Sequence, residues 1–253
     1  MVRAGLPLFA LLAGLFTVPA SAELRLSASC PDIKLPPIAL PKVRRMLAAG
    51  QELTIVAFGS STTQGSHATD MRHTYPAILQ LELEAALPDA HVAVINRGVG
   101  GQDAPEMMAR LDTDVLALRP TLVIWQVGAN GAMRGSDPSS FTTLVDAGVR
   151  KLEQSGADVI LMDNQRSPAV LASPQHAQID QALADVAQRD DARLFARGRL
   201  MELWKDAGHP YAEFLADDGI HHNDRGYACI AKALAQSMLE GLGPMTRRLS
   251  ASQ

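Results

Sequence analysis

The chain has 253 residues, a formal net charge of −4 and 47% hydrophobic residues, proportions that are typical of a folded globular protein. Its basic residues are scattered along the sequence rather than clustered, which argues against nucleic acid as a partner. Two cysteines are too few for a cysteine-based zinc cluster or a disulfide-dense scaffold. The sequence leaves open whether Cys30 and Cys229 pair with each other or remain free thiols.

The first residues have the pattern of a secretory signal peptide. Arg3 precedes an apolar run over residues 6–18, and Ala20, Ser21 and Ala22 are small residues typical of a cleavage site. We therefore predict a signal peptide over residues 1–22 and export to the periplasm or beyond after cleavage near Ala22. An uncleaved anchor is disfavoured, because the run is short and no later stretch reaches the roughly twenty apolar residues of a spanning helix. No stable membrane insertion is expected.

The remaining chain, about 230 residues, has the length of one large domain, and its composition does not divide it. A proline-rich arm with a short helix is predicted over residues 23–50, and its first part, to Pro41, is expected to lie on the surface. The main domain is predicted over residues 51–245, followed by a tail at 246–253.

From Glu52 onward, short β-branched runs alternate with longer amphipathic segments, a pattern typical of parallel strands joined by crossover helices. Strands are predicted at 53–58, 91–95, 122–127, 158–162 and, from a weaker pattern, 193–195. Helices are predicted at about 75–87, 104–118, 139–154, 175–189 and 224–239. Such a chain forms a three-layer sandwich in which ligands bind outside the carboxyl ends of the strands. The loops that follow the strands are therefore expected to carry the site.

The segment after the first predicted strand, Gly59 to Gly65, holds small hydroxyl residues between two glycines at a strand-to-helix junction. A turn of this kind presents a serine oxygen at a helix N-terminus, where backbone amides stabilise negative charge. Taken alone, the segment is better explained as a helix cap, since Ser and Thr are the commonest capping residues and need no catalytic role there. It does not match the phosphate-binding Gly-x-x-x-x-Gly-Lys-Ser/Thr loop, because no lysine follows.

Two further loops can supply hydrogen-bond donors at the same edge of the sheet. The glycine-rich segment Asn96 to Gly101 follows the second predicted strand, and its backbone amides can bind an oxyanion. Asn130 lies among small residues after the third strand, and its side-chain amide can donate to the same group. Each segment by itself is better explained by ordinary turn chemistry.

A polar loop over residues 217–223 precedes the last predicted helix, and in it Asp218 lies three residues before His221. A carboxylate bound to one imidazole nitrogen fixes the tautomer and leaves the other nitrogen free to accept a proton from a serine. A solvated histidine followed by a helix cap at Asn223 or Asp224 is the simpler alternative.

A metal site formed by Asp217, His221 and His222 is disfavoured, because adjacent histidines point in different directions unless the loop bends. No metal and no cofactor are therefore predicted.

One such loop can arise by chance, but four of them in order after consecutive elements of one parallel sheet are much less probable as a coincidence. Their order resembles that of the SGNH hydrolases, also called the GDSL esterase and lipase superfamily, over nearly all of the mature chain. Gly59 to Gly65 is similar to the family's Gly-Asp-Ser block, Asn96 to Gly101 to its glycine block, Gly128 to Asn130 to its asparagine block, and Asp218 to His221 to its Asp-x-x-His block. The resemblance implies a three-layer α/β/α sandwich of flavodoxin-like order with a five-stranded parallel sheet.

The resemblance also implies a role for each matching residue. Ser61 would be the nucleophile, His221 the general base and Asp218 the acid that orients it. The backbone amides of Ser61 and Gly101 and the side chain of Asn130 would form the oxyanion hole.

One departure from the family is visible at Ser60, which stands where the family has aspartate. The choice between the two neighbouring serines depends on register, and the spacing to Thr63 and Gly65 selects Ser61.

The predicted function is that of an exported serine esterase that hydrolyses carboxylic acyl esters through an acyl-enzyme. Short-chain or carbohydrate O-acetyl esters are favoured, because no long insertion is present to form a lipid-binding lid. A thioesterase, a lysophospholipase or an acyltransferase of the same fold remain alternatives, as do a catalytically silent carbohydrate-binding module and a metal-dependent hydrolase. The sequence does not determine the oligomeric state.

Overall fold

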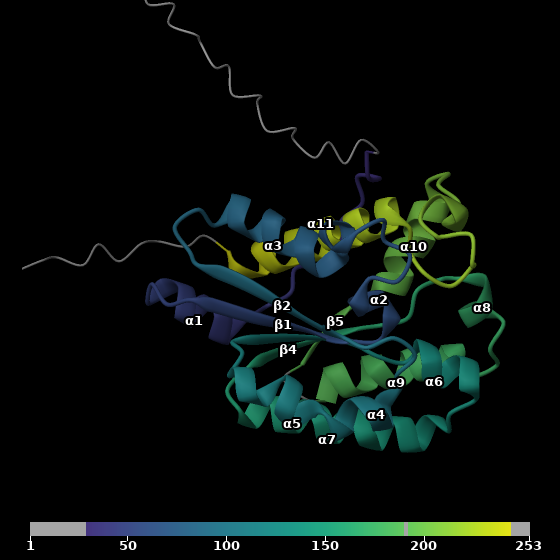
Figure 1. The fold of residues 1–253 in the computed structure, drawn as a ribbon, viewed down its shortest axis with the longest axis horizontal. Helices are drawn as coiled ribbons and strands as arrows, with labels where there is room; N and C mark the ends of the chain where they lie inside the picture. Colours follow the sequence, from purple (N-terminus) through teal and green to yellow (C-terminus); the bar gives the residue numbers. More distant parts are fainter. Residues whose placement is uncertain (1–28, 190–191, 244–253) are drawn as a thin grey trace, which may run out of the picture.

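A computed structural model describes residues 29–189 and 192–243 (Figure 1). The predicted signal peptide, the first residues of the arm and the tail at 246–253 lie outside the described residues.

A five-stranded parallel sheet forms the middle layer. Its strands are β1 (Leu53–Gly59), β2 (Val92–Gly98), β3 (Leu122–Gln126), β4 (Asp158–Met162) and β5 (Arg193–Phe195). They lie in the order β2-β1-β3-β4-β5, and all four neighbouring pairs are parallel. The chain leaves β1 toward β2 on one side and crosses back to β3 on the other, so the switch point of this flavodoxin-like order lies between β1 and β3. The predicted fold class is confirmed.

Helices cover both faces of the sheet (Figure 1). One face carries α3 (Tyr75–Ala86), α10 (Arg197–Asp206) and α11 (Asp224–Leu242), and the other α4 (Ala104–Ala109), α5 (Leu111–Asp114), α7 (Pro138–Gln154) and α9 (His176–Arg189). The remaining helices are α1 (Pro41–Ala48), α2 (Ser61–Gln64), α6 (Ala129–Arg134) and α8 (Pro168–Leu171), with the short 3-10 turns η1 (Met71–His73), η2 (Leu116–Leu118) and η3 (Tyr211–Glu213).

Side chains along the strands point alternately to the two faces of the sheet and form the two halves of the core. In β1, Ile55 and Ala57 pack against α3 and α11, whereas Val56 and Phe58 face the helices of the opposite layer. Side chains of a strand alternate between faces, so a strand that is apolar throughout fills both halves. Burial of this kind contributes roughly 25 cal/mol per Å² of apolar surface, so the sheet is a well-packed support for a site at its edge.

Two predicted boundaries were wrong for a shared reason. The helix predicted at 104–118 is broken at Arg110, and β2 continues to Gly98 instead of ending at Ile95. The Arg110 guanidinium reaches back to donate to the carbonyls of Gly59 and Arg97 at the ends of β1 and β2. Contacts between distant segments therefore override the local pattern.

The arm is less superficial than expected. Leu35, Ile38 and Leu40 are buried in the half of the core that contains α11. Gly241 of α11 permits this approach, because a Cβ there would lie 1.8 Å from the carbonyl oxygen of Ile38. The irregular spacing of the arm's apolar residues, set by its prolines, hides this burial from any search for periodicity.

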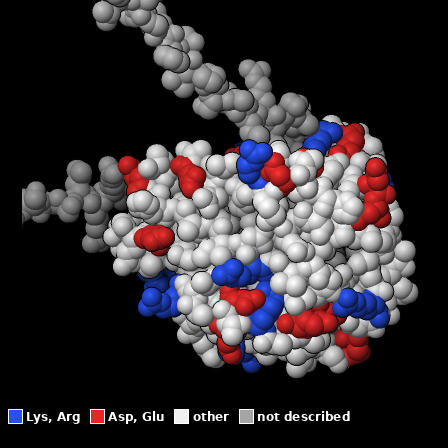
Figure 2. All heavy atoms as spheres, in the orientation of Figure 1, with Lys and Arg blue, Asp and Glu red and all other residues white. Residues whose placement is uncertain are grey.

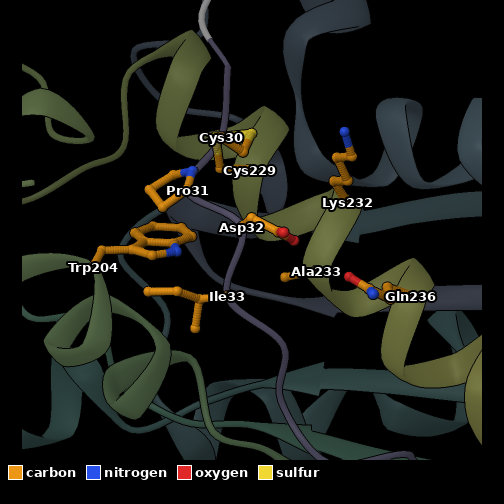
Figure 3. Close-up of a pocket in the computed structure, with 9 residues that line it drawn as sticks. All are labelled: Cys30, Pro31, Asp32, Ile33, Trp204, Cys229, Lys232, Ala233 and Gln236. Carbon is orange, nitrogen blue, oxygen red and sulfur yellow. A yellow bond between two sulfur atoms is a disulfide. The ribbon is translucent and has the colours of Figure 1, made fainter. Parts of the chain in front are cut away.

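Cys30 of the arm and Cys229 of α11 form a disulfide (Figure 3). The bond joins residues 199 positions apart, and it lies beside a cavity of about 230 Å³ that the arm, Trp204 and α11 line. Cross-links over long loops restrict the unfolded chain most strongly. The disulfide therefore fixes the arm against the last helix.

The surface carries both signs of charge. On the face drawn in Figure 2, acidic and basic side chains are interspersed. Across residues 29–189 and 192–243, no helix has the length and apolar character needed to cross a membrane.

Candidate active site

Ser61 begins the one-turn helix α2 directly after β1, at the sheet's switch point. The turn requires glycine at two places. Gly65 ends α2 with φ of 100°, in the left-handed region that favours glycine. Gly98, at the end of β2, passes so close beneath α2 that a Cβ would lie 2.0 Å from the backbone nitrogen of Gln64. The close approach of β2 thus holds the serine turn against the sheet.

The two neighbouring serines face opposite ways. Ser60 is buried, and both its backbone N–H and its hydroxyl donate to Oε1 of Gln126 at the end of β3, over 3.0 and 3.1 Å. Ser61 is partly exposed, and its Oγ lies 2.7 Å from Nε2 of His221. The structure therefore places Ser61, not Ser60, beside the predicted base.

A chain of hydrogen bonds continues from Ser61 through His221 to Asp218. His221 Nδ1 lies 2.5 Å from Oδ2 of Asp218, a distance that requires the ring nitrogen to donate to the carboxylate. Nε2 is then the unprotonated nitrogen, and it can accept the proton of the Ser61 hydroxyl. The predicted Ser, His and Asp side chains are brought together in the order that this chemistry needs, across 160 residues of sequence.

Asp218 is held as a carboxylate. Partial burial acts to raise its pKa, but the hydrogen bond from the His221 ring and those from the backbone N–H groups of His221 and Ile220 outweigh it and lower the pKa to about 2. A carboxylate that accepts several hydrogen bonds favours its charged form. Asp218 is therefore charged throughout the neutral range and can stabilise a positive imidazolium.

The loop that carries His221 rests on buried polar groups. Gln165 donates from Nε2 to the carbonyl of Ile220, and Arg197 donates to Oε1 of the same glutamine. Arg197 is fully buried, and it also donates to the carbonyl of Asp163 at the end of β4. The carboxyl end of the sheet thus supports the loop.

The predicted oxyanion-hole residues surround one turn. Asn130 lies in the first turn of α6, and its Nδ2 donates to the carbonyl of Gln102 over 2.8 Å. Gly101 has φ of 77°, and its carbonyl accepts from Nη2 of Arg134. A Cβ on the preceding Gly100 would lie 3.9 Å from Cβ of Ser61. Ser61, Gly101 and Asn130 therefore come from three loops that meet at this turn.

His222 points away from the site. It is fully buried, and its Nδ1 donates to the carbonyl of Phe214 over 3.1 Å. The adjacent His221 faces Ser61, so the two histidines diverge as predicted, and the grouping of Asp217, His221 and His222 is not formed.

His67 is the side chain at the site that the sequence did not indicate. Its Nε2 lies 3.1 Å from Oδ2 of Asp218, and its ring stacks on that of His221 with centroids 5.2 Å apart and planes 15° apart. It stands in an irregular loop, where neither periodicity nor a motif marks it.

The three side chains His67, Asp218 and His221 offer ligand atoms within 4.8 Å of one another, a grouping that can be compared with a metal site. Two ligands of one zinc ion lie about 3.2 Å or more apart, since each bond is about 2.0 to 2.2 Å long. The 2.5 Å between His221 Nδ1 and Asp218 Oδ2 is shorter and belongs to a hydrogen bond. The donor set as it stands fits a hydrogen-bonded triad better than a coordination shell.

The family model of the Non-GDSL lipase-like family matches residues 27–244. The chain belongs to this family. Membership confirms the resemblance to the SGNH and GDSL hydrolases.

Two curated relatives agree with the family. An arylesterase from Vibrio mimicus is 26% identical over 176 residues, which cover 66% of this chain and 84% of the relative. Esterase TesA from Pseudomonas aeruginosa is 28% identical over 121 residues, which cover 48% of this chain and 58% of the relative. Together with the family, these relatives identify the chain as an ester-hydrolysing enzyme.

Solved structures share the fold. A two-domain esterase active on acetylated mannans superposes with a TM-score of 0.70 at 23% identity, over 85% of this chain and 57% of that chain. A lipase/acylhydrolase from Enterococcus faecalis gives 0.64 at 21% identity, over 78% of this chain and 100% of that chain. The chain thus spans little more than half of the two-domain esterase, and at these identities the likeness concerns the fold.

The buried His222 generates a test of acid stability. Burial and the nearby positive charge of Arg197 lower the pKa of His222 to about 3, against about 6.5 for a histidine in an unfolded chain. Between these values the unfolded chain binds a proton that the folded protein does not, so the free energy of unfolding should fall as pH is lowered from about 6.5 toward 3. A His222→Gln variant, whose amide can also donate to Phe214, should lose less stability over this range in urea unfolding at several pH values. The exposed His91→Gln is the control, and equal slopes for His222→Gln and the parent protein would contradict the prediction.

Proposed function

We propose that the chain is an exported serine esterase that hydrolyses carboxylic acyl esters through Ser61, His221 and Asp218. The observation that carries the proposal is the pair of hydrogen bonds that joins these side chains, 2.7 Å from Ser61 to His221 and 2.5 Å from His221 to Asp218. Its place at the switch point of the sheet, where ligands of such folds bind, supports the same conclusion.

Each residue has a defined part in the proposed reaction. Ser61 Oγ attacks the ester carbonyl carbon while His221 Nε2 takes the hydroxyl proton, and the Asp218 carboxylate stabilises the resulting imidazolium. His221 then returns the proton to the leaving alcohol, and an acyl-enzyme remains on Ser61. Water repeats the sequence, giving up its proton to His221 and releasing the acid. No step uses a metal or an organic cofactor.

The negative charge on the carbonyl oxygen is proposed to be stabilised by the backbone amides of Ser61 and Gly101 and by Nδ2 of Asn130. The Nδ2 group carries two hydrogens, and the carbonyl of Gln102 uses one of them, which leaves the second for the substrate. Arg134 and Asn130 both bind carbonyls of the glycine turn, so the donors are held in place before substrate arrives.

Short acyl chains, and acetyl groups on carbohydrates in particular, are the proposed substrates. The structural relatives include the esterase active on acetylated mannans and an acetyl xylan esterase, which superposes with a TM-score of 0.62 at 21% identity. No long insertion in the sequence is available to form a lipid-binding lid.

Export is proposed on two independent grounds. Residues 1–22 have the pattern of a cleavable signal peptide. The disulfide between Cys30 and Cys229 is of a kind that persists in oxidising compartments and is rare in the cytosol of mesophiles. We further propose that the arm from residue 23 and the main domain over 51–245 act as one unit after cleavage.

A serine-directed fluorophosphonate tests the nucleophile. Ser61→Ala should lose labelling and on the order of 10⁴-fold or more of the turnover of an aryl acetate, because no other group can form the acyl-enzyme. Ser60→Ala is the matched control and should still be labelled. Asn130→Ala should also be labelled, but with turnover reduced on the order of 10²-fold. Labelling that is lost in Ser60→Ala and kept in Ser61→Ala would overturn the assignment.

A panel of substrates tests the acyl group. If the site accepts short acyl chains as proposed, kcat/KM should fall roughly tenfold or more from p-nitrophenyl acetate to the octanoate. Acetylated xylan or mannan oligosaccharides should release acetate. The assay contains a chelator, which should leave the rate unchanged. Rates that rise with chain length would favour a thioesterase or lysophospholipase, and glycan binding without hydrolysis would favour a silent binding module. Acetyl transfer to an added sugar acceptor would favour an acyltransferase.

Mass spectrometry of the chain produced in a bacterium tests export. The periplasmic or secreted protein should begin at Glu23 and should contain no free thiol, because the leader is removed and the two cysteines are joined. The double variant Ala20→Arg/Ala22→Arg should keep the leader. Recovery of the uncleaved chain from the cytosol with two reactive thiols would contradict the proposal.

A further inference from the structure

Asp218 is shared by two histidines. Its Oδ2 lies 2.5 Å from Nδ1 of His221 and 3.1 Å from Nε2 of His67, while its Oδ1 accepts the backbone N–H groups of Ile220 and His221 over 3.0 Å each. A carboxylate has about four sites for accepting hydrogen bonds. With His67 as a donor all four are used, and neither oxygen is free to rotate away.

The loop around His67 is built to hold that ring in place. On one side of it, the hydroxyl of Tyr227 donates to the carbonyl of Ser66 over 2.6 Å. On the other side, the backbone N–H and hydroxyl of Thr69 donate to the two carboxylate oxygens of Asp224, over 2.9 and 2.7 Å. Both partners belong to α11, the helix that follows the His221 loop.

The backbone of His67 is itself unusual. Its φ is 65°, a left-handed conformation that few residues other than glycine adopt, although histidine is among those enriched there. Strained conformations of this kind persist where surrounding contacts determine them, and they gather at functional sites. Here the anchors on both sides keep the imidazole stacked on His221 although 47% of its side chain is exposed.

We propose that His67 is a positioning residue for the esterase reaction: its ring donates from Nε2 to Asp218 and thereby fixes the carboxylate that orients His221. The proposal rests on the proposed role of Ser61, His221 and Asp218. It adds a fourth side chain to that arrangement, one that acts through Asp218 and does not touch the reacting atoms.

The same geometry makes the charge of His67 matter. A protonated His67 would form an ion pair with Asp218 and would place a positive charge beside the stacked His221 ring, which must itself become positive as Ser61 attacks. The neutral form therefore supports the reaction and the charged form opposes it.

Asp218 and His221 are the charged or titratable groups in contact with the His67 ring. The elements packed around its loop also carry Asp224 and Tyr227 of α11, Asp70 just before η1, and Arg72 and His73 within η1. Asp224 is occupied by Thr69, and Asp70 pairs with Arg72 and His73.

The experiment compares two replacements of His67 in the full chain. His67→Asn removes the ring but suits the left-handed backbone, so the fold should be kept. Its kcat on an aryl acetate should fall roughly tenfold with KM unchanged. This loss is at the lower end of the roughly 10- to 100-fold losses that follow removal of a hydrogen-bond partner that orients a metal-ligating side chain. His67→Gln retains an amide that can donate to Asp218, and it should recover most of the lost kcat. His91→Ala, at an exposed histidine just before β2, is the control and should match the parent enzyme.

The pH profile gives a readout that a merely structural role would not change. Neither variant can place a cation beside a positive His221, so the acidic limb of kcat/KM should move to higher pH in both, and further in His67→Asn, which also lacks the donor to Asp218. In an Asp218→Ala background, His67→Asn should have no further effect, because the two act as one unit.

The outcomes separate this inference from the proposed function. If Ser61→Ala is inactive while His67→Asn keeps the parent kcat and pH profile, the role of His67 is wrong and the esterase assignment stands. A change in KM alone would make His67 a substrate contact and would also overturn its positioning role. If Ser61→Ala stays active, both proposals fail.

Discussion

The site depends on one constraint, the strand order that places β2 on one side of β1 and β3 on the other. Because β2 and β3 flank β1, the loops after these three strands meet at one edge of the sheet, and they carry Ser61, Gly101 and Asn130. The register of β1 with β2 runs through the pair Gly59 and Gly98, the last residues of both strands. A side chain at Gly98 would displace α2, so the position of the serine is set by how closely the second strand can approach.

The other half of the triad reaches the same edge by a different route. His221 and Asp218 belong to a loop before α11 that no strand immediately precedes, and buried groups of the interior hold it. Gln165, which follows β4, donates to the carbonyl of Ile220 in this loop, and Arg197 at the start of α10 holds that glutamine. The neutral His222 fastens the other side of the loop to Phe214. Buried polar groups are unfavourable without hydrogen bonds, so the bonds that Arg197 and His222 make to Gln165, Asp163 and Phe214 favour this conformation of the loop. The disulfide from the arm to α11 restrains the helix that follows.

The sequence was sufficient for features whose cause is local. Strands β1, β3 and β4 are buried and mainly apolar, and all five strands were predicted to within three residues at either end. Asp218 and His221 were predicted from a spacing that one loop can satisfy by itself. Ser61 was predicted from the resemblance of its block to the family's and from its register against Thr63 and Gly65. The break at Arg110, the burial of Leu35 and Ile38 and the approach of His67 were missed, because each depends on a partner far away in sequence. Nothing in the residues around His67 indicates that Tyr227 and Asp224 will fasten its loop.

The serine at position 60, where the family has aspartate, is also explained by a contact with a residue far away in the sequence. Oε1 of Gln126 accepts three donors there, the N–H and hydroxyl of Ser60 and the hydroxyl of Thr63. An aspartate at position 60 would set a carboxylate, which has no proton to donate, against that buried amide oxygen, and an unpaired buried charge is strongly unfavourable. Serine at 60 and glutamine at 126 therefore form a matched pair across β1 and β3. Asp218 is the carboxylate that is hydrogen-bonded to the proposed base. The hydrogen bonds that orient Asp218 therefore govern how His221 faces Ser61.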